Sequence, residues 1–139
     1  MAYLPDDLPL PNTDELDTRV WWEHCAKKEL VIQQCAKCKT FRHPPMPVCF
    51  NCHSFDFTWT PVEGRGTVHS FTVAHHPVHA SLRDRGPYNI VIVDLPHAGV
   101  RMIGNAIDVK NDELYVGMPL ALTWETRGGV TMPQWKRAT

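Results

Sequence analysis

The sequence predicts a mainly β protein in which an N-terminal α-helix and a metal-binding arm precede a five-stranded barrel. Three observations lead to this fold class. Four cysteines stand in two Cys-x-x-Cys pairs in the first half of the chain. A helical apolar pattern precedes them, and five β-like segments separated by glycine and proline turns follow. We therefore divide the chain into a tail and helix (1–28), a cysteine arm (29–60) and a barrel (61–139).

Length and charge limit the possible classes of function. With 139 residues and a formal net charge of −1, the chain can form one ordinary domain, or a barrel with a small module attached. No segment has the excess of cations that binding to nucleic-acid phosphates requires. The longest aliphatic run, 90–93, is too short to span a bilayer, and the first residues lack the pattern of a signal peptide. We expect a cytoplasmic protein that binds neither nucleic acid nor membrane.

The first expected element is a helix over residues 13–28. Asn12 or Thr13 can cap it, and acidic residues follow where the helix dipole favours negative charge. Its approximate apolar stripe consists of Leu16, Val20, Trp22, Cys25 and Ala26. Trp21 lies away from the centre of this stripe, so the two adjacent tryptophans cannot both face one narrow core. Either each packs on the arm or the barrel, or one of them covers a ligand or partner surface.

The four paired cysteines are the expected ligands of one metal ion: Cys35, Cys38, Cys49 and Cys52. A reducing cytosol disfavours disulfides, and a redox motif would use a single pair at the start of a helix. Four thiolates close the coordination sphere of zinc, so the ion would support structure and perform no catalysis. Iron accepts the same ligands and stays open as an alternative. The fifth cysteine, Cys25, is expected to be a buried apolar residue on the helix.

Alternating apolar residues and turn signals predict the strands. Segments 29–35 and 55–64 are expected to enter and leave the cysteine arm, and Phe55, Phe57 and Trp59 should share one face of the second segment. The barrel strands are expected at 66–76, 89–95, 100–109, 119–126 and 130–136. This pattern favours a closed barrel of the oligonucleotide/oligosaccharide-binding (OB) type, with an open antiparallel sandwich as the alternative.

Histidines are the other candidate chemistry. His75, His76 and His79 precede a polar loop and could bind a second metal or exchange protons. No nearby carboxylate completes a common metal site, so we favour a solvated loop or a partner contact and leave their role open. His69 alternates with Val68 and is expected to face outward or into a partner.

Four stretches together carry a resemblance to a known family: "LVIQQCAKCKTFRHPPMPVCFNCHS", "GRGTVHSFTVAHHPVH", "VGMPLALTWE" and "GVTMPQWK". The chain resembles the acyl-CoA-associated OB-fold family, whose members join an N-terminal helix and a rubredoxin-like zinc ribbon to an OB-fold barrel. The likeness extends from about residue 14 to residue 137. Zinc knuckles often have glycine after the second cysteine of a pair, where the backbone is left-handed, whereas this chain has Lys39 and His53 there.

The resemblance implies an accessory subunit whose partner carries the catalytic groups. The expected partners are thiolase-superfamily acyltransferases and lipid-transfer-protein-like aldolases of steroid side-chain degradation, and acyl-CoA is the expected shared ligand. The resemblance also implies that the four paired cysteines bind the metal, that Arg42 lies on the ribbon arm and that Arg65 opens the first barrel strand. The residues expected to contact acyl-CoA or the partner are Arg42, Arg65, Arg83, Arg85, Trp21 and Trp22.

Two classes of function therefore remain. The first is a non-catalytic subunit of a hetero-oligomer, with self-pairing into a homodimer also open. The second is a single-stranded nucleic-acid-binding OB module, which the charge balance and the dispersed aromatic residues disfavour. We identify no catalytic residues, because no nucleophile with a base or phosphate-binding loop is present in the pattern.

Overall fold

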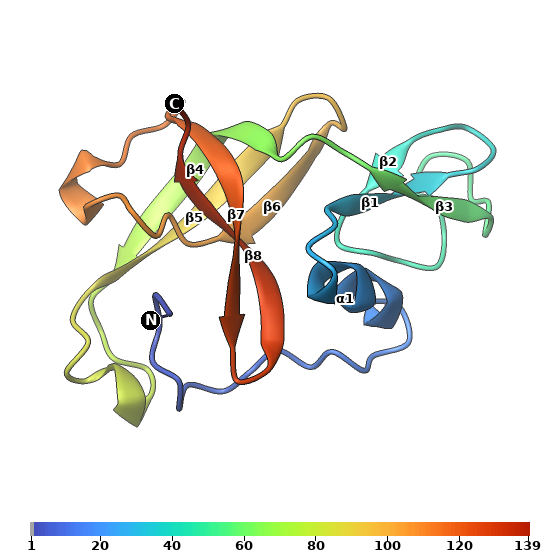
Figure 1. Ribbon diagram of the computed structural model, residues 1–139. Coiled ribbons are helices and arrows are strands. Elements are labelled where there is room, and N and C mark those ends of the chain that lie inside the picture. The colour runs from blue at the N-terminus through green and yellow to red at the C-terminus, as the bar shows by residue number, and fades with distance from the viewer. Residues whose placement is uncertain (1) are drawn as a thin grey trace.

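The computed structural model, described for residues 2–139, contains one α-helix and two antiparallel sheets (Figure 1). The small sheet has the order β2-β1-β3 and the barrel sheet has the order β6-β5-β4-β7-β8. The elements are α1 (Arg19–Ala26), β1 (Val31–Cys35), β2 (Phe41–Arg42), β3 (Phe57–Pro61), β4 (Arg65–Ala74), η1 (Ala80–Leu82), β5 (Tyr88–Leu95), β6 (Val100–Gly104), η2 (Asn111–Glu113), β7 (Pro119–Arg127) and β8 (Val130–Arg137). The predicted mainly β class and the five barrel strands are confirmed.

The helix is shorter than expected. It begins at Arg19 instead of residue 13, and its N-cap residue, Thr18, makes no side-chain capping hydrogen bond. Asn12 Oδ1 instead accepts a hydrogen bond from the Asp14 backbone N–H (3.0 Å), a local turn that competes with helix formation. No helix among the residues described has the length and hydropathy needed to cross a membrane.

The buried face of α1 also differs from the expected stripe. Trp21 is buried and its Nε1–H donates to the Val31 carbonyl (3.0 Å), whereas Leu16 and Val20 are exposed. Trp22 is half-buried and meets the Trp21 ring edge-on, with ring centroids 4.9 Å apart. The helix packs against both β1 and β8, so its buried face is set by two neighbours at once. Cys25 is buried as expected, and burial raises its pKa to about 12.

The barrel core follows the strand period. Alternate residues of β5 point inward, ending in the fully buried Val91, Val93 and Leu95. The expected strand over 100–109 stops at Gly104, and the chain then bends so that Ala106 forms a parallel bridge with Trp135 of β8. The Ile107 N–H donates to the Trp135 carbonyl (2.9 Å), which nearly closes the barrel.

A buried amide organises this closure. Asn89, at the start of β5, is fully buried. Its Nδ2 donates to the Ala106 carbonyl (3.0 Å) and to Tyr3 Oη (2.8 Å), and its Oδ1 accepts from the Ala106 N–H (2.7 Å). Asn105 Nδ2 donates to the Asn89 carbonyl (2.6 Å). One side chain thus joins β5, the closing segment and the N-terminal residues.

The N-terminal residues form a strap on the barrel. Arg127 is buried at the end of β7 and donates to the carbonyls of Leu8 (2.6 Å), Pro5 (3.2 Å) and Pro9 (3.4 Å). In Figure 1 this segment runs beside the β7–β8 hairpin before it reaches α1. A buried arginine usually needs a carboxylate partner. Here three carbonyl groups take the place of the carboxylate as acceptors for the guanidinium.

We predict that Asn89→Ala lowers the free energy of unfolding by about 3 kcal/mol, because it leaves buried backbone groups of residue 106 without partners. Asn111→Ala is the matched control, since its amide makes only two hydrogen bonds of 3.3 Å and should cost under about 1 kcal/mol. Urea unfolding followed by tryptophan fluorescence measures both. Equal losses in the two variants would contradict the role given to Asn89.

Candidate functional site

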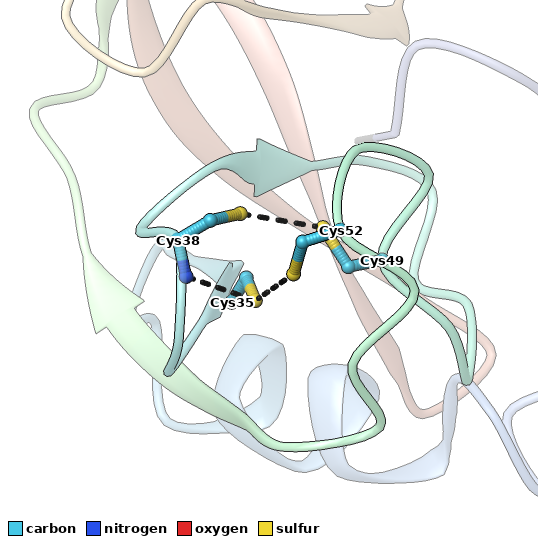
Figure 2. A group of neighbouring side chains, drawn as sticks. All are labelled: Cys35, Cys38, Cys49 and Cys52. Atoms are coloured by element: carbon cyan, nitrogen blue, oxygen red, sulfur yellow. Dashed lines mark hydrogen bonds between the residues drawn. The ribbon is translucent and has the colours of Figure 1, made fainter.

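The four predicted cysteines converge. Cys35 ends β1, and Cys38 lies in the turn that follows it. Cys49 and Cys52 belong to a second turn, which faces the first (Figure 2). All four Sγ atoms lie within 4.8 Å of one another, with 3.5 Å between Cys35 and Cys52 and 3.6 Å between Cys38 and Cys49. A tetrahedral ion with Zn–S bonds of about 2.3 Å separates its sulfurs by about 3.8 Å. The arrangement therefore fits one zinc ion with no open coordination position.

Both turns have the same backbone conformation. The Lys39 N–H donates to the Cys35 carbonyl (3.0 Å), and the His53 N–H donates to the Cys49 carbonyl (2.9 Å). Lys39 and His53 have φ values of 66° and 63°, so the left-handed conformation expected at these positions is confirmed. A side chain costs about 1 kcal/mol there relative to glycine. The knuckle geometry thus persists without the glycines.

Polar side chains beside the cluster shift the pKa values of the cysteines. Thr40 Oγ1 lies 3.1 Å from Cys38 Sγ, and Asn51 Nδ2 donates to the same sulfur over 3.6 Å. Hydrogen bonding to Thr40, with help from Asn51, lowers the pKa of Cys38 to about 5. A backbone hydrogen bond at Ser54 lowers the pKa of Cys52. Burial and the neighbouring sulfurs outweigh it and raise this pKa to about 11. A divalent cation would hold all four as thiolates.

Sequence reasoning missed Thr40 and Asn51. The available signal was a short polar side chain two residues after Cys38 and another between the cysteines of the second pair. Metal ligands are commonly oriented by such hydrogen bonds. All five cysteines are free thiols, in agreement with a metal site and not with disulfides.

We predict that Cys49→Ala abolishes metal binding and unfolds the arm, because three thiolates and an empty corner cannot hold zinc in a closed site. Cys25→Ala is the matched control: it removes a buried thiol outside the cluster and should keep one zinc per chain. Elemental analysis of reduced protein and far-ultraviolet circular dichroism check this. Retention of a full zinc equivalent by Cys49→Ala would contradict the ligand assignment.

Arg42 lies on the ribbon arm, as expected, but it is buried. Its Nε donates to the Met46 carbonyl (3.0 Å), and its guanidinium lies 5.2 Å from the centre of the Phe57 ring. Nη1 and Nη2 are buried and have no hydrogen-bond partner among residues 2–139. Gln33 Oε1 accepts from the Met46 N–H (2.8 Å), so two buried side chains hold the proline-rich loop, residues 43–47.

The other predicted contact residues do not join Arg42. Arg65 begins β4 as expected, is exposed, and pairs with Glu63 (3.6 Å). Arg83 is exposed after η1, while the Arg85 guanidinium stacks 4.4 Å from the centre of the Tyr3 ring. Arg42, Arg65 and Arg85 line three separate clefts and Arg83 lines none of these, so the structure does not assemble them into one anion site. Their contacts with acyl-CoA, and those of Trp21 and Trp22, stay predictions.

The loop histidines do not form a metal cluster. Among residues 2–139, the four cysteines are the only group of three or more such side chains whose ligand atoms converge. His75 Nδ1 contacts the Val73 carbonyl (3.1 Å), and His79 caps η1 through Ser81. His69 faces outward as predicted and pairs with Asp94 (3.2 Å).

A cleft of about 760 Å³ separates the arm from the barrel. Its polar groups include Asp94, which also binds Arg101 (2.8 Å), and its apolar lining includes Phe41 and Phe50. His43 lies in its wall, with its ring centroid 5.4 Å from that of Trp21. Burial lowers the pKa of His43 to about 4, and its buried Nδ1 has no hydrogen-bond partner among the described residues.

The depressed pKa of His43 predicts acid sensitivity. The unfolded chain protonates this imidazole near pH 6.5 and the folded chain only near pH 4, so stability falls as pH drops through this window. Between pH 7 and pH 5 the loss should be about 2 kcal/mol, and His43→Phe should remove it while keeping the aromatic contact. His76→Phe, in an exposed loop, is the control. Urea titrations at both pH values, with zinc content checked, measure this, and an unchanged loss in His43→Phe would contradict it.

Fold and site define a class of protein. A helix and a four-cysteine ribbon precede a nearly closed five-stranded barrel, and the helix packs on both the ribbon and the barrel. Two family models match this chain, the ChsH2 rubredoxin-like zinc ribbon domain over residues 22–58 and the ChsH2 C-terminal OB-fold domain over residues 59–125. The chain therefore belongs to the ChsH2 (DUF35) family.

Similar proteins are described as parts of larger assemblies. A probable enoyl-CoA hydratase alpha subunit of Thermomonospora curvata is 40% identical over 123 residues, which cover 88% of this chain and 38% of that protein. A 3-oxo-4,17-pregnadiene-20-carboxyl-CoA hydratase alpha subunit of Mycobacterium tuberculosis is 32% identical, with coverage of 94% and 39%. This chain thus spans about two-fifths of the length of these relatives. A solved chain of an Ltp2-ChsH2(DUF35) aldolase is 38% identical, with a TM-score of 0.81 and coverage of 95% of this chain and 100% of that one.

Proposed function

We propose that this protein is a non-catalytic, zinc-stabilised subunit that docks on a thiolase-like acyltransferase or an Ltp2-like aldolase and helps to form its acyl-CoA site. The likeness to the ChsH2 chain of the Ltp2-ChsH2(DUF35) aldolase over nearly the whole chain is the observation that carries this proposal. The coenzyme A thioesters in the names of the two hydratase relatives support acyl-CoA as the ligand and suggest steroid or lipid degradation as the setting.

The chemistry of the site agrees with an accessory role. Four sulfurs saturate a tetrahedral zinc ion, so the metal would supply structure and no activated water. Arg42, Arg65 and Arg85 lie in three separate clefts, so a phosphate-bearing ligand would need further groups from a partner. A four-thiolate metal site assembles most readily where thiols stay reduced, which supports a cytoplasmic location.

We predict that co-expression with an Ltp2-like or thiolase-like subunit of the same genome yields a stable complex, and that only the complex cleaves or condenses acyl-CoA. The purified, zinc-loaded chain should show no turnover alone, because the partner supplies the catalytic groups. Size-exclusion chromatography with light scattering measures the complex. Free thiol release measures acyl transfer with a thiolase-like partner, and chromatography of the acyl-CoA products measures carbon–carbon cleavage with an Ltp2-like partner, which releases no thiol.

Two outcomes would contradict the proposal. Robust thioester cleavage by the isolated chain would make it an enzyme in its own right. Salt-sensitive capture of a single-stranded oligonucleotide, with no capture of the enzyme subunit, would favour a nucleic-acid-binding module instead. The Cys25→Ala variant should copurify with the enzyme subunit as well as the wild type does, whereas Cys49→Ala should not.

A further inference from the structure

An apolar groove of about 290 Å³ lies on the zinc ribbon, away from the metal ligands. We call it the ribbon groove and define it by six of its lining residues: Leu16, Val20, Met46, Phe55, Phe57 and Trp59. They come from three segments, namely the first residues of α1 with Leu16 just before it, the proline-rich loop, and β3 with the residue two before it. Folding therefore brings this surface together. The alternation of Phe55, Phe57 and Trp59 along the sequence accounts for only one of its three parts.

The exposure of these side chains is unusually large for apolar residues gathered in one place. Leu16 is 85% exposed, Phe55 is 71% exposed, and Met46 is 43% exposed. Scattered apolar residues on a surface need no explanation, but a contiguous patch marks an interaction site. Covering such side chains contributes about 25 cal/mol for each Å² removed from water.

The groove is built on a fixed floor. Phe57 and Trp59 meet edge-on with ring centroids 5.5 Å apart, and the buried Arg42 guanidinium lies over the Phe57 ring. The Met46 N–H is held by buried Gln33. A surface whose floor is already ordered loses little conformational entropy when a partner covers it.

The charge around the ribbon groove indicates whether a different protein or a second copy of this chain covers it. Asp17 lines the groove and is exposed, and Asp14 and Glu15 are exposed on the same segment, where Asp14 pairs with Arg19 (2.9 Å). Two copies meeting through this groove would bring acidic rims together, which costs association energy. A different protein with basic residues around an apolar anchor complements the same surface.

We propose that the ribbon groove is the surface through which this chain docks on its enzyme subunit, and that the subunit inserts large apolar side chains flanked by lysine or arginine. This inference rests on the proposed function and adds to it the face of the chain that is used and the chemistry of the partner's contact.

The test compares two double variants that add the same charge at exposed apolar positions. Leu16→Asp/Phe55→Asp changes the groove, and Val78→Asp/Val116→Asp changes residues that are 75% and 65% exposed outside it. Against the copurifying enzyme subunit, we expect the groove variant to raise Kd by at least about tenfold and the control to leave it unchanged. Asp17→Lys should also weaken binding and reduce its dependence on salt. Zinc content and thermal unfolding confirm that each variant is folded.

The outcomes separate this inference from the proposed function. If the wild type binds the enzyme subunit and the groove variant binds equally well, the groove is not the docking face and the proposed function stands. If the folded wild type does not bind, both fall. If the wild type forms a dimer that only the groove variant dissolves, the groove pairs two copies of this chain and the inference is overturned.

Discussion

Convergence of four sulfur atoms on one point is the constraint on which the zinc ribbon, residues 29–60, depends. The strands around it are short, with five residues in β1, two in β2 and five in β3, and a sheet of this size encloses no core of its own. Like-charged thiolates repel one another unless a cation lies between them. A cation bound by the four sulfurs would stabilise the ribbon, as apolar burial stabilises the barrel. The proline-rich loop is held by the ribbon strands, so its position also depends on the metal site.

A second constraint couples the ribbon to the barrel. Trp21 is the central contact, because its ring is buried and its indole N–H is bonded to the first ribbon strand while α1 also packs on β8. The Val62 N–H adds a direct link to the Leu30 carbonyl (3.2 Å). These contacts give the two modules a defined arrangement, and the cleft and the groove both take residues from more than one segment. A surface assembled in this way suits recognition of a folded partner, since its shape is present before binding.

The arginines show how a residue type with an obvious ligand role is used structurally. Arg127 holds the N-terminal strap through carbonyl groups, Arg85 stacks on Tyr3, and Arg42 supports the proline-rich loop. Each guanidinium offers several donors in one plane, so it can join chain segments that share no strand ladder. Counting cations along a sequence gives no indication of this use, because folding chooses the acceptors: the carbonyls that Arg127 binds lie 118 to 122 residues away in the chain. The polar network around Asn89 closes the barrel on the same principle.

The sequence by itself determined which four cysteines converge, the order of ribbon and barrel, the presence of five barrel strands and the exposure of His69. These features depend on local spacing: two residues between thiols, a period of two along strands, and glycine or proline at turns. Only the tertiary structure decided where α1 begins, which tryptophan is buried, where β6 stops and how the arginines are distributed. A helix end, a buried face or a barrel seam is fixed by competition between contacts from segments far apart in the chain. Leu16 illustrates the difference, since its helical spacing predicted a core position and the packing left it at the mouth of a groove.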